Sequence, residues 1–236
     1  MKSLILSDIH MGSRLFKHED FILDLLYKEQ YKEIILCGDI IDVLEKPYNK
    51  ILCEHFELIS RINLLTETTK VVLVVGNHDP TYSILCSLFP HCYIMEKYSS
   101  DNIPNTIFIH GHKYAHFMNE HPILSDIVFR ITKFFSIFGF NIREFLRELF
   151  FILIHGGNIK MHMELILQNE INAIKAYKEL YSNIVMGHTH IPKIYNYSSV
   201  MNPKYYINCG DWVYNYTYVI YNHEIDKFTL NYYQGN

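Results

Sequence analysis

The sequence has few of the features that mark disulfide-rich, membrane-spanning or nucleic-acid-binding proteins. Its five cysteines form no CxxC pair and are odd in number, so reduced thiols are expected rather than a disulfide framework. The most apolar region, residues 127–154, is interrupted by Arg, Lys and Glu and contains no uncharged stretch of the roughly 18 residues that a membrane span requires. The formal net charge of −4 offers no general attraction to phosphates, so nucleic acid is not an expected partner.

A secretory signal is also missing from the start of the chain. The first apolar run, residues 4–6, leads directly into a polar motif at Asp8 and could not be cleaved away without destroying it. We therefore expect a cytoplasmic location. The sequence contains no internal repeat and no low-complexity tract.

The chain is predicted to fold as one α/β domain spanning residues 1–236. Its length allows a substantial core, and short apolar runs alternate with helix-like segments near the N-terminus, as in βαβ units with strands buried on both faces. A strand-rich C-terminus favours a sandwich of two sheets. The expected strands are 4–6, 34–37, 71–75, 93–95, 106–109, 184–186, 204–208, 217–221 and 228–233, and the expected helices are 18–30 and 51–66.

Five polar motifs lie at the ends of these apolar runs. In open α/β sheets, loops at the carboxyl ends of the strands converge on one crevice, so we expect the motifs to form a single site. A glycine lies beside the polar residues in four of them, where tight loops and close backbone approach are needed. The motifs are Asp8-x-His10, Gly38-Asp39, Gly76-Asn77-His78-Asp79, His110-Gly111-His112 and Gly187-His188-Thr189-His190.

The side chains in these motifs are carboxylates, an amide and imidazoles, without thiolates. This donor set suits Mn²⁺, Fe or Zn²⁺, and there are enough donors for two ions. Two ions held about 4 Å apart can activate water and stabilise phosphoryl oxygens. The pattern therefore predicts hydrolysis of a phosphate ester or anhydride with two divalent metal ions, for which Mn²⁺ is the first choice.

The spacing of the motifs indicates an insertion at about residues 113–159. The first four motifs follow one another at about the length of a βαβ unit, whereas the fifth comes only after a much longer interval. This segment is rich in phenylalanine with basic residues interspersed, a pattern typical of amphipathic helices at a membrane interface. It is interpreted either as a lid that accepts acyl chains and contacts the membrane peripherally, or as a hairpin that packs into the core or a homodimer interface.

The five motifs together resemble those of the calcineurin-like metallophosphoesterases, and the resemblance spans Asp8 to His190 in the expected order. It implies a four-layer αββα sandwich. It also implies that His78 lies over the substrate phosphorus without binding metal, and we expect Asp79 to hold this imidazole. Asp42 is either a second orienting carboxylate or a helix N-cap. The resemblance assigns Asp8, His10, Asp39 and His190 to one ion, and Asp39, Asn77, His110 and His188 to the other.

Within this family, residues 7–14, the insertion and the late segment 208–213 are similar to UDP-2,3-diacylglucosamine diphosphatases and their relatives. In the best-known of those enzymes the fourth motif reads His-Gly-Asp, whereas this chain has His110-Gly111-His112. The similarity implies a nucleotide diphospho-sugar or lipid substrate. Arg14 follows the first motif and is predicted to bind a substrate phosphate through its fork of donors, with an ordinary surface arginine as the alternative.

Two other functions fit the same fold. A general phosphodiesterase or nuclease would use the same metal ligands, but the acidic balance and the absence of a Lys/Arg run near any motif disfavour nucleic acid. A noncatalytic scaffold would tend to lose metal ligands or the histidine next to Asn77. This chain keeps both, so we expect an enzyme.

Overall fold

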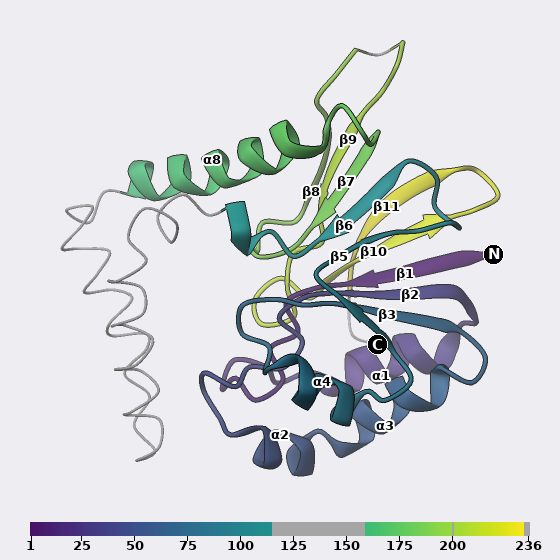
Figure 1. Cartoon of the computed structure of the whole chain (residues 1–236), viewed down its shortest axis with the longest axis vertical. Coiled ribbons are helices and arrows are strands. Elements are labelled where there is room, and N and C mark those ends of the chain that lie inside the picture. Colours follow the sequence, from purple (N-terminus) through teal and green to yellow (C-terminus); the bar gives the residue numbers. More distant parts are fainter. Residues whose placement is uncertain (115–158, 200, 234–236) are drawn as a thin grey trace.

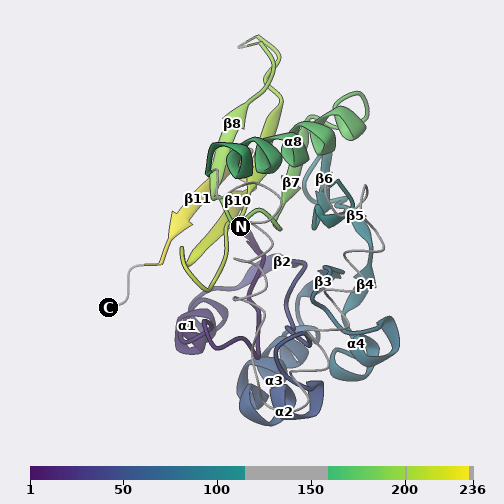
Figure 2. The same cartoon turned by 90° about the vertical axis from the view of Figure 1, so that its left-hand side faces the viewer.

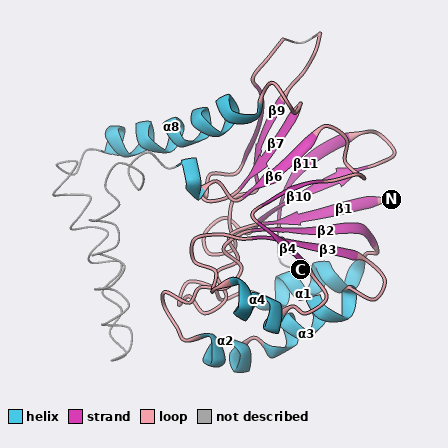
Figure 3. Ribbon diagram, in the orientation of Figure 1, coloured by secondary structure: helices cyan, strands magenta, loops and turns pink. Residues whose placement is uncertain are grey.

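The computed structural model describes residues 1–114, 159–199 and 201–233. Two β-sheets lie face to face, and helices cover the outer side of each (Figure 1). Figure 3 shows the same layers by type of element, with helix, sheet, sheet and helix in succession. The predicted four-layer αββα sandwich is therefore confirmed.

The first sheet has six strands in the order β11-β10-β1-β2-β3-β4. Its four strands from the N-terminal half run parallel, and the two C-terminal strands add to the β1 side in antiparallel pairing. The polar motifs at residues 8, 39 and 77 follow three neighbouring parallel strands and so meet at one edge. The strands are β1 (Lys2–Leu6), β2 (Tyr31–Cys37), β3 (Lys70–Val74), β4 (Tyr93–Met95), β10 (Thr217–Asn222) and β11 (Lys227–Tyr232).

The second sheet has five strands in the order β5-β6-β7-β9-β8. Its three central strands are parallel to one another, and the edge strands β5 and β8 are antiparallel to their neighbours. The motifs at residues 110 and 188 follow two adjacent parallel strands. The strands are β5 (Lys97–Ser99), β6 (Thr106–Ile109), β7 (Asn183–Met186), β8 (Lys193–Asn196) and β9 (Tyr205–Asn208).

Helices cover the two outer faces unequally. Four helices pack on the first sheet, whereas α8 lies across the second sheet (Figure 2). A short 3-10 helix, η1 (His112–Tyr114), follows the fourth motif. The helices are α1 (Glu19–Lys28), α2 (Tyr48–Glu54), α3 (Phe56–Leu65), α4 (Tyr82–Leu88) and α8 (Ile159–Tyr177).

Alternation along the central strands fills both interfaces of the first sheet. In β1, Leu4 and Leu6 belong to the core beneath the helices, whereas Ile5 belongs to the core between the two sheets. All three side chains are fully buried, as expected where successive residues point to opposite faces and both faces are covered. A third apolar cluster, which includes Ala173 of α8 and Ile184 of β7, joins that helix to the second sheet.

The structure differs from the sequence prediction in a few elements. The helix expected over 51–66 is two helices, α2 and α3, because the backbone leaves the helical conformation at His55, whose ring pairs with Glu19 of α1. The long helix α8 and the short elements α4, β5 and β8 were not predicted. The insertion expected at about 113–159, with its proposed membrane or dimer contact, lies almost wholly outside the described residues. None of the helices in the described residues has both the length and the apolar character that a membrane span requires.

Candidate metal centre

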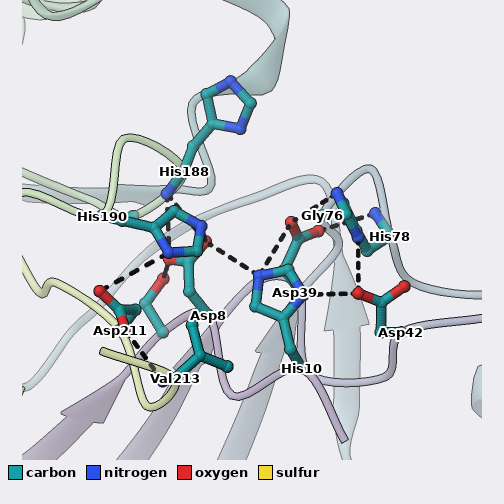
Figure 4. A network of polar contacts seen from close by, with 12 residues as sticks. Asp8, His10, Asp39, Asp42, Gly76, His78, His188, His190, Asp211 and Val213 are labelled. Carbon is teal, nitrogen blue, oxygen red and sulfur yellow. Dashed lines mark hydrogen bonds and ion pairs between the residues drawn. The ribbon is translucent and has the colours of Figure 1, made fainter. Parts of the chain in front are cut away.

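The five polar motifs meet where the carboxyl ends of the parallel strands of both sheets come together. Asp8, Asp39 and Asn77 follow β1, β2 and β3, while His110 and His188 follow β6 and β7. Figure 4 shows the side chains of Asp8 and Asp39 close to the rings of His10 and His190. Groups of histidine and aspartate atoms there lie within 4.8 Å of one another, a spacing that suits a common metal ion.

The first group consists of Asp8, His10 and His190. The Nε2 atom of His190 lies 3.2 Å from Asp8 Oδ1, and the Nε2 atom of His10 lies 3.9 Å from the same oxygen. The rings of His10 and His190 are stacked with centroids 5.2 Å apart. Asp39 Oδ2 completes the group at 3.8 Å from His10 Nε2. These are the four residues that the family resemblance assigns to the first ion.

The second group is built around Asp39 and His110. Asp39 Oδ2 lies 3.3 Å from His110 Nε2, and the side-chain oxygen of Asn77 lies 3.2 Å from the same nitrogen. The ring of His188 stands edge-on to His110 with centroids 5.2 Å apart. This contact places the His188 side chain with the second group, and Figure 4 shows its ring directed away from Asp8. The backbone N–H of His188, in contrast, donates to the Asp8 carboxylate.

The chemistry of the pocket fits a bound cation. The Nε2 atom of His10 is buried and has no hydrogen-bond partner in the described part of the chain, although it faces carboxylate oxygens of Asp8 and Asp39. A buried polar atom without a partner is costly and calls for an explanation. A divalent ion between these groups would satisfy the nitrogen and both carboxylates.

Two glycines allow the loops to approach this closely. A Cβ atom at Gly187 would lie 1.8 Å from Ser7 Oγ and 2.3 Å from Asp8 Oδ2. Gly38 has a φ of +90°, and a Cβ atom there would lie 2.4 Å from the ring of His110. Each glycine therefore leaves space for a candidate ligand from a different loop, as expected where backbones pass close to a site.

Several candidate ligands adopt left-handed backbone conformations. The φ values are 51° at Asp8, 55° at His10, 52° at Asp39, 66° at His188 and 58° at His190. Such conformations cost roughly 1–3 kcal/mol each and persist only where the surroundings enforce them. Their concentration in one pocket indicates that the loops are held in place to present these side chains.

His78 and His10 share one buried carboxylate, that of Asp42. The Nδ1 atoms of both rings lie 3.0 Å from Asp42 Oδ2, which leaves both Nε2 atoms facing Asp39 at 3.8 Å. Asp42 Oδ1 accepts a hydrogen bond from the N–H of Leu44 in a turn, and the next helix begins only at Tyr48. Of the two roles considered for Asp42, the helix N-cap was wrong, and the residue orients imidazoles.

Asp79 has a different place from the one expected for it. Its carboxylate accepts hydrogen bonds from the backbone N–H groups of Asp39, Ile40, Ile41 and Gly76. Asp79 therefore ties the loop after β2 to the loop after β3. The expectation that Asp79 holds His78 is corrected, because the carboxylate at hydrogen-bonding distance from the His78 ring is that of Asp42.

Asp211 is a buried residue of the site to which the sequence analysis gave no role. Its Oδ2 atom lies 3.6 Å from His190 Nδ1, while Oδ1 accepts hydrogen bonds from the N–H groups of Val213 and Tyr214. The residue thus orients His190 from behind, as second carboxylates commonly do for metal-binding histidines. A usable signal was present, because Asp211 follows β9, which is parallel to β7.

The electrostatics of the pocket are dominated by carboxylates close to histidines. Burial opposes charge, yet His190 and other neighbours lower the pKa of Asp8 to about 2, and Asp39 helps to raise the pKa of His110 to about 9 against the effect of burial. For His190, Asp8 and Asp211 outweigh burial and raise the pKa to about 10. Burial and then His110 lower the pKa of His188 to about 3. Protons and metal ions therefore compete for the same pocket.

Two further residues of the motifs lie at the edge of this cluster. Arg14 is exposed, and its backbone N–H donates to Glu45, so the substrate-binding role of its side chain stays a prediction. His112 lies near His110, with ring centroids 5.4 Å apart, and lines a neighbouring cavity of about 190 Å³ with Tyr114 and Tyr177.

Known proteins share the family and the fold of this chain. A model of the calcineurin-like phosphoesterase family matches residues 1–226. No protein of curated function matches the sequence. A solved archaeal phosphodiesterase is similar, with 16% identity, a TM-score of 0.51 and coverage of 99% of this chain and 100% of its own.

Two other solved structures are similar at lower scores. The phosphoesterase Yfce from E. coli has 14% identity and a TM-score of 0.49, with 98% of each chain covered. The zinc complex of Vps29 from Entamoeba histolytica also has 14% identity and a TM-score of 0.49, with 99% of this chain and 92% of that chain covered. From the family match over nearly its whole length, the chain belongs to the calcineurin-like phosphoesterases and is a metal-dependent phosphoesterase.

Proposed function

We propose that the chain hydrolyses phosphate esters or anhydrides with two divalent ions held in the pocket described above. Asp8, His10, Asp39 and His190 would hold one ion, and Asp39, Asn77, His110 and His188 the other. The observation that carries the proposal is the position of Asp39. One oxygen of this carboxylate lies 3.3 Å from His110 and 3.8 Å from His10, so it faces imidazoles of both groups.

The bound ions would supply an activated water and a counter-charge for the phosphoryl oxygens. The residues of this chain contribute position and charge. Asp8 and Asp39 keep low pKa values despite burial, so both remain ionised for a cation at neutral pH. Asp42 and Asp211 orient His10 and His190 from behind, which fixes the nitrogen that each ring turns toward the pocket.

We assign His78 to the substrate, although its ring also lies close enough to His10 and Asp39 to share a metal ion with them. Its ring is held by Asp42, and its backbone N–H donates to Asp39 Oδ1 at 2.8 Å, so both its main chain and its ring are fixed relative to the bridging carboxylate. The side chain is nearly buried, at 8% exposure. From this position the imidazole would donate a proton or a hydrogen bond to the leaving oxygen, a contribution of the general acid kind.

For the substrate we propose a nucleotide-linked diphosphate, such as a nucleotide diphospho-sugar or its diacylated form. The support is the similarity of residues 7–14 and 208–213 to UDP-2,3-diacylglucosamine diphosphatases. Part of this similarity has a structural counterpart, because Asp211 of the second segment lies behind His190. Arg14 is proposed to bind a phosphate of this substrate.

The experiment is turnover of a small panel in Mn²⁺, with Fe²⁺ and Zn²⁺ as alternative metals. The panel contains an aryl phosphodiester, a cyclic nucleotide, DNA, a nucleotide diphospho-sugar and its diacylated form. Preference for either of the last two compounds supports the proposed substrate, and preference for the last shows that the acyl chains are recognised. Preference for the cyclic nucleotide or the aryl diester indicates a general phosphodiesterase, and cleavage of DNA at moderate salt indicates a nuclease. No turnover of any compound by metal-loaded protein would overturn the proposal.

A further inference from the structure

A buried glutamate on α8 faces the loop that carries two of the candidate ligands. Glu170 is fully buried, in the layer where α8 packs on the second sheet. A buried carboxylate is costly unless it is paired and hydrogen-bonded. One oxygen of Glu170 lies 2.6 Å from Lys193 Nζ at the start of β8, and the other accepts a hydrogen bond of 3.3 Å from the hydroxyl of Thr189.

Thr189 lies between His188 and His190, so this hydrogen bond reaches the middle of the loop that carries these two candidate ligands. The Thr189 hydroxyl also accepts a hydrogen bond of 2.9 Å from the side-chain amide of Asn208. The same amide donates to the carbonyl oxygen of Gly187 at 2.9 Å. A continuous chain of polar contacts therefore runs from α8 through Thr189 to the glycine that begins the motif.

The backbone of this loop needs such support. Both histidines have positive φ values, 66° and 58°, and residues held in this way relax unless several contacts fix them. The backbone N–H of Thr189 donates to the carbonyl of Gly187 at 2.8 Å, which closes a tight turn. The hydroxyl of Thr189 fixes the orientation of that turn relative to the helix.

Asn169, the residue before Glu170 in α8, faces the loop after β6, which carries His110 and His112. The side-chain amide of Asn169 lies 3.3 Å from the carbonyl oxygens of Gly111 and Tyr114, so its nitrogen is the atom that faces them. Two consecutive buried residues of one helix thus contact both loops through which the second sheet supplies imidazoles. Figure 2 shows α8 lying across β6 and β7, which lead into these loops.

We propose that Glu170 is a positioning residue of the metal centre, which acts through the Thr189 hydroxyl to set the directions of His188 and His190. The proposal rests on the metal-binding roles proposed for these two histidines. Removing a residue that orients a metal ligand typically lowers metal affinity or activity by about 10–100-fold. A glutamate that only fastened the helix would leave metal affinity unchanged when the Thr189 hydroxyl alone was lost.

The test is Mn²⁺ binding by the Thr189→Val variant, measured by titration calorimetry together with the melting temperature of the chelated protein. Valine keeps the shape of threonine and leaves the Glu170–Lys193 pair intact. The matched control is Thr106→Val. Thr106 is a buried threonine of the same sheet that also donates one hydrogen bond and accepts one, but it lies at the start of β6, away from the metal loops.

We expect Thr189→Val to weaken Mn²⁺ binding about 10–100-fold and Thr189→Ser to bind Mn²⁺ as the unsubstituted protein does. Thr106→Val should lower the melting temperature about as much as Thr189→Val but leave Mn²⁺ binding unchanged. Because Thr189→Val also removes the hydrogen bond from Asn208, Glu170→Met is measured beside it. This variant removes the acceptor from the other side and should weaken binding in the same way. Wild-type affinity in either folded variant, or an equal loss in Thr106→Val, would overturn the inference. Failure of the unsubstituted protein to bind Mn²⁺ would instead reject the metal centre itself.

Discussion

At the scale of single residues, Asp39 is the side chain on which both groups of candidate ligands depend. Its Oδ2 atom faces His10, His78 and His110, and its Oδ1 atom accepts the backbone N–H of His78. Its burial is nearly complete at 1% exposure. Removing this carboxylate would leave neighbouring imidazoles without a counter-charge.

We therefore expect Asp39→Ala to bind neither ion and to reduce hydrolysis to background. Metal analysis of the purified and dialysed variant measures the first effect directly. Asp24→Ala is a suitable control, because Asp24 is a carboxylate of α1 that pairs with Lys28 on the surface. Retention of two ions per chain in Asp39→Ala would contradict the bridging role.

His78 should behave differently from Asp39. We expect His78→Ala to keep both ions and lose about 10²–10⁴-fold in rate, the usual contribution of an acid or base. Metal content and turnover measured on the same preparation separate the two effects. The rate loss in His78→Ala should be smaller for substrates with a better leaving group, because such groups need less protonation. An equal rate loss for all leaving groups would argue against proton donation by His78.

Asp42 provides a third test at this scale. Its carboxylate contacts both His10 and His78, so Asp42→Ala should affect a metal ligand and the substrate-facing imidazole together. We expect a loss of about 10–100-fold in both metal affinity and rate. Asp79→Ala is the informative comparison, because Asp79 contacts backbone N–H groups and should act mainly through stability. Unchanged metal affinity in Asp42→Ala would mean that His10 needs no orienting carboxylate.

At the scale of elements, the strand ends could be predicted from the sequence, and the contacts behind them could not. Apolar runs followed by Gly-Asp or Gly-His are local signals, and the carboxyl ends of parallel strands meet wherever such a sheet forms. The ring of His78, in contrast, is held by Asp42, which lies 36 residues away in the sequence. The adjacent Asp79 was the natural choice from the sequence, but neighbouring residues in a loop point in different directions.

The second sheet was the harder half to predict for the same reason. The positions of His110 and His188 followed from β6 and β7, but Glu170 lies within a helix that was not predicted, and nothing local to Glu170 indicates that it faces Thr189. Asp211 was within reach of the strand-end rule.

The loops between elements also give a test. A Cβ atom at Gly187 would overlap Ser7 Oγ and Asp8 Oδ2, so we expect Gly187→Ala to displace Asp8 and weaken binding of the first ion. Metal titration is the measurement. Combining it with Ser7→Gly removes one of the two overlaps and should restore part of the affinity. A Gly187→Ala variant with normal binding would show that the two loops can separate without cost.

At the scale of the whole molecule, the two ions would connect the two sheets. Each proposed ion takes ligands from loops of the six-stranded sheet and from loops of the five-stranded sheet. Each ion that binds the folded state alone should stabilise it by about 2.7 kcal/mol at one hundred times its dissociation constant. For a chain of this size that corresponds to a rise in melting temperature of about 5–10 °C per ion. Calorimetric melting with and without a chelator measures it, and Asp39→Ala should show no difference.

Metal binding should also depend on pH across the whole centre. His110 and His190 have pKa values raised to about 9 and about 10, so both rings carry a proton at neutral pH that an ion must displace. Affinity should therefore rise with pH, by about tenfold per unit for each proton displaced, and level off above these pKa values. Calorimetry at pH 7 in buffers of different ionisation enthalpy should detect proton release, and none would contradict this account.

The left-handed backbone at residues 8, 10, 39, 188 and 190 also limits which sequence changes the protein can tolerate. Asn, Asp and His accept this conformation more readily than β-branched residues do. Exchanges among those three types should preserve the loops while altering which cation is preferred. Valine or isoleucine would instead remove the ligand and distort the turn at the same time. Few single substitutions at these positions can therefore change the metal preference without damaging the loops.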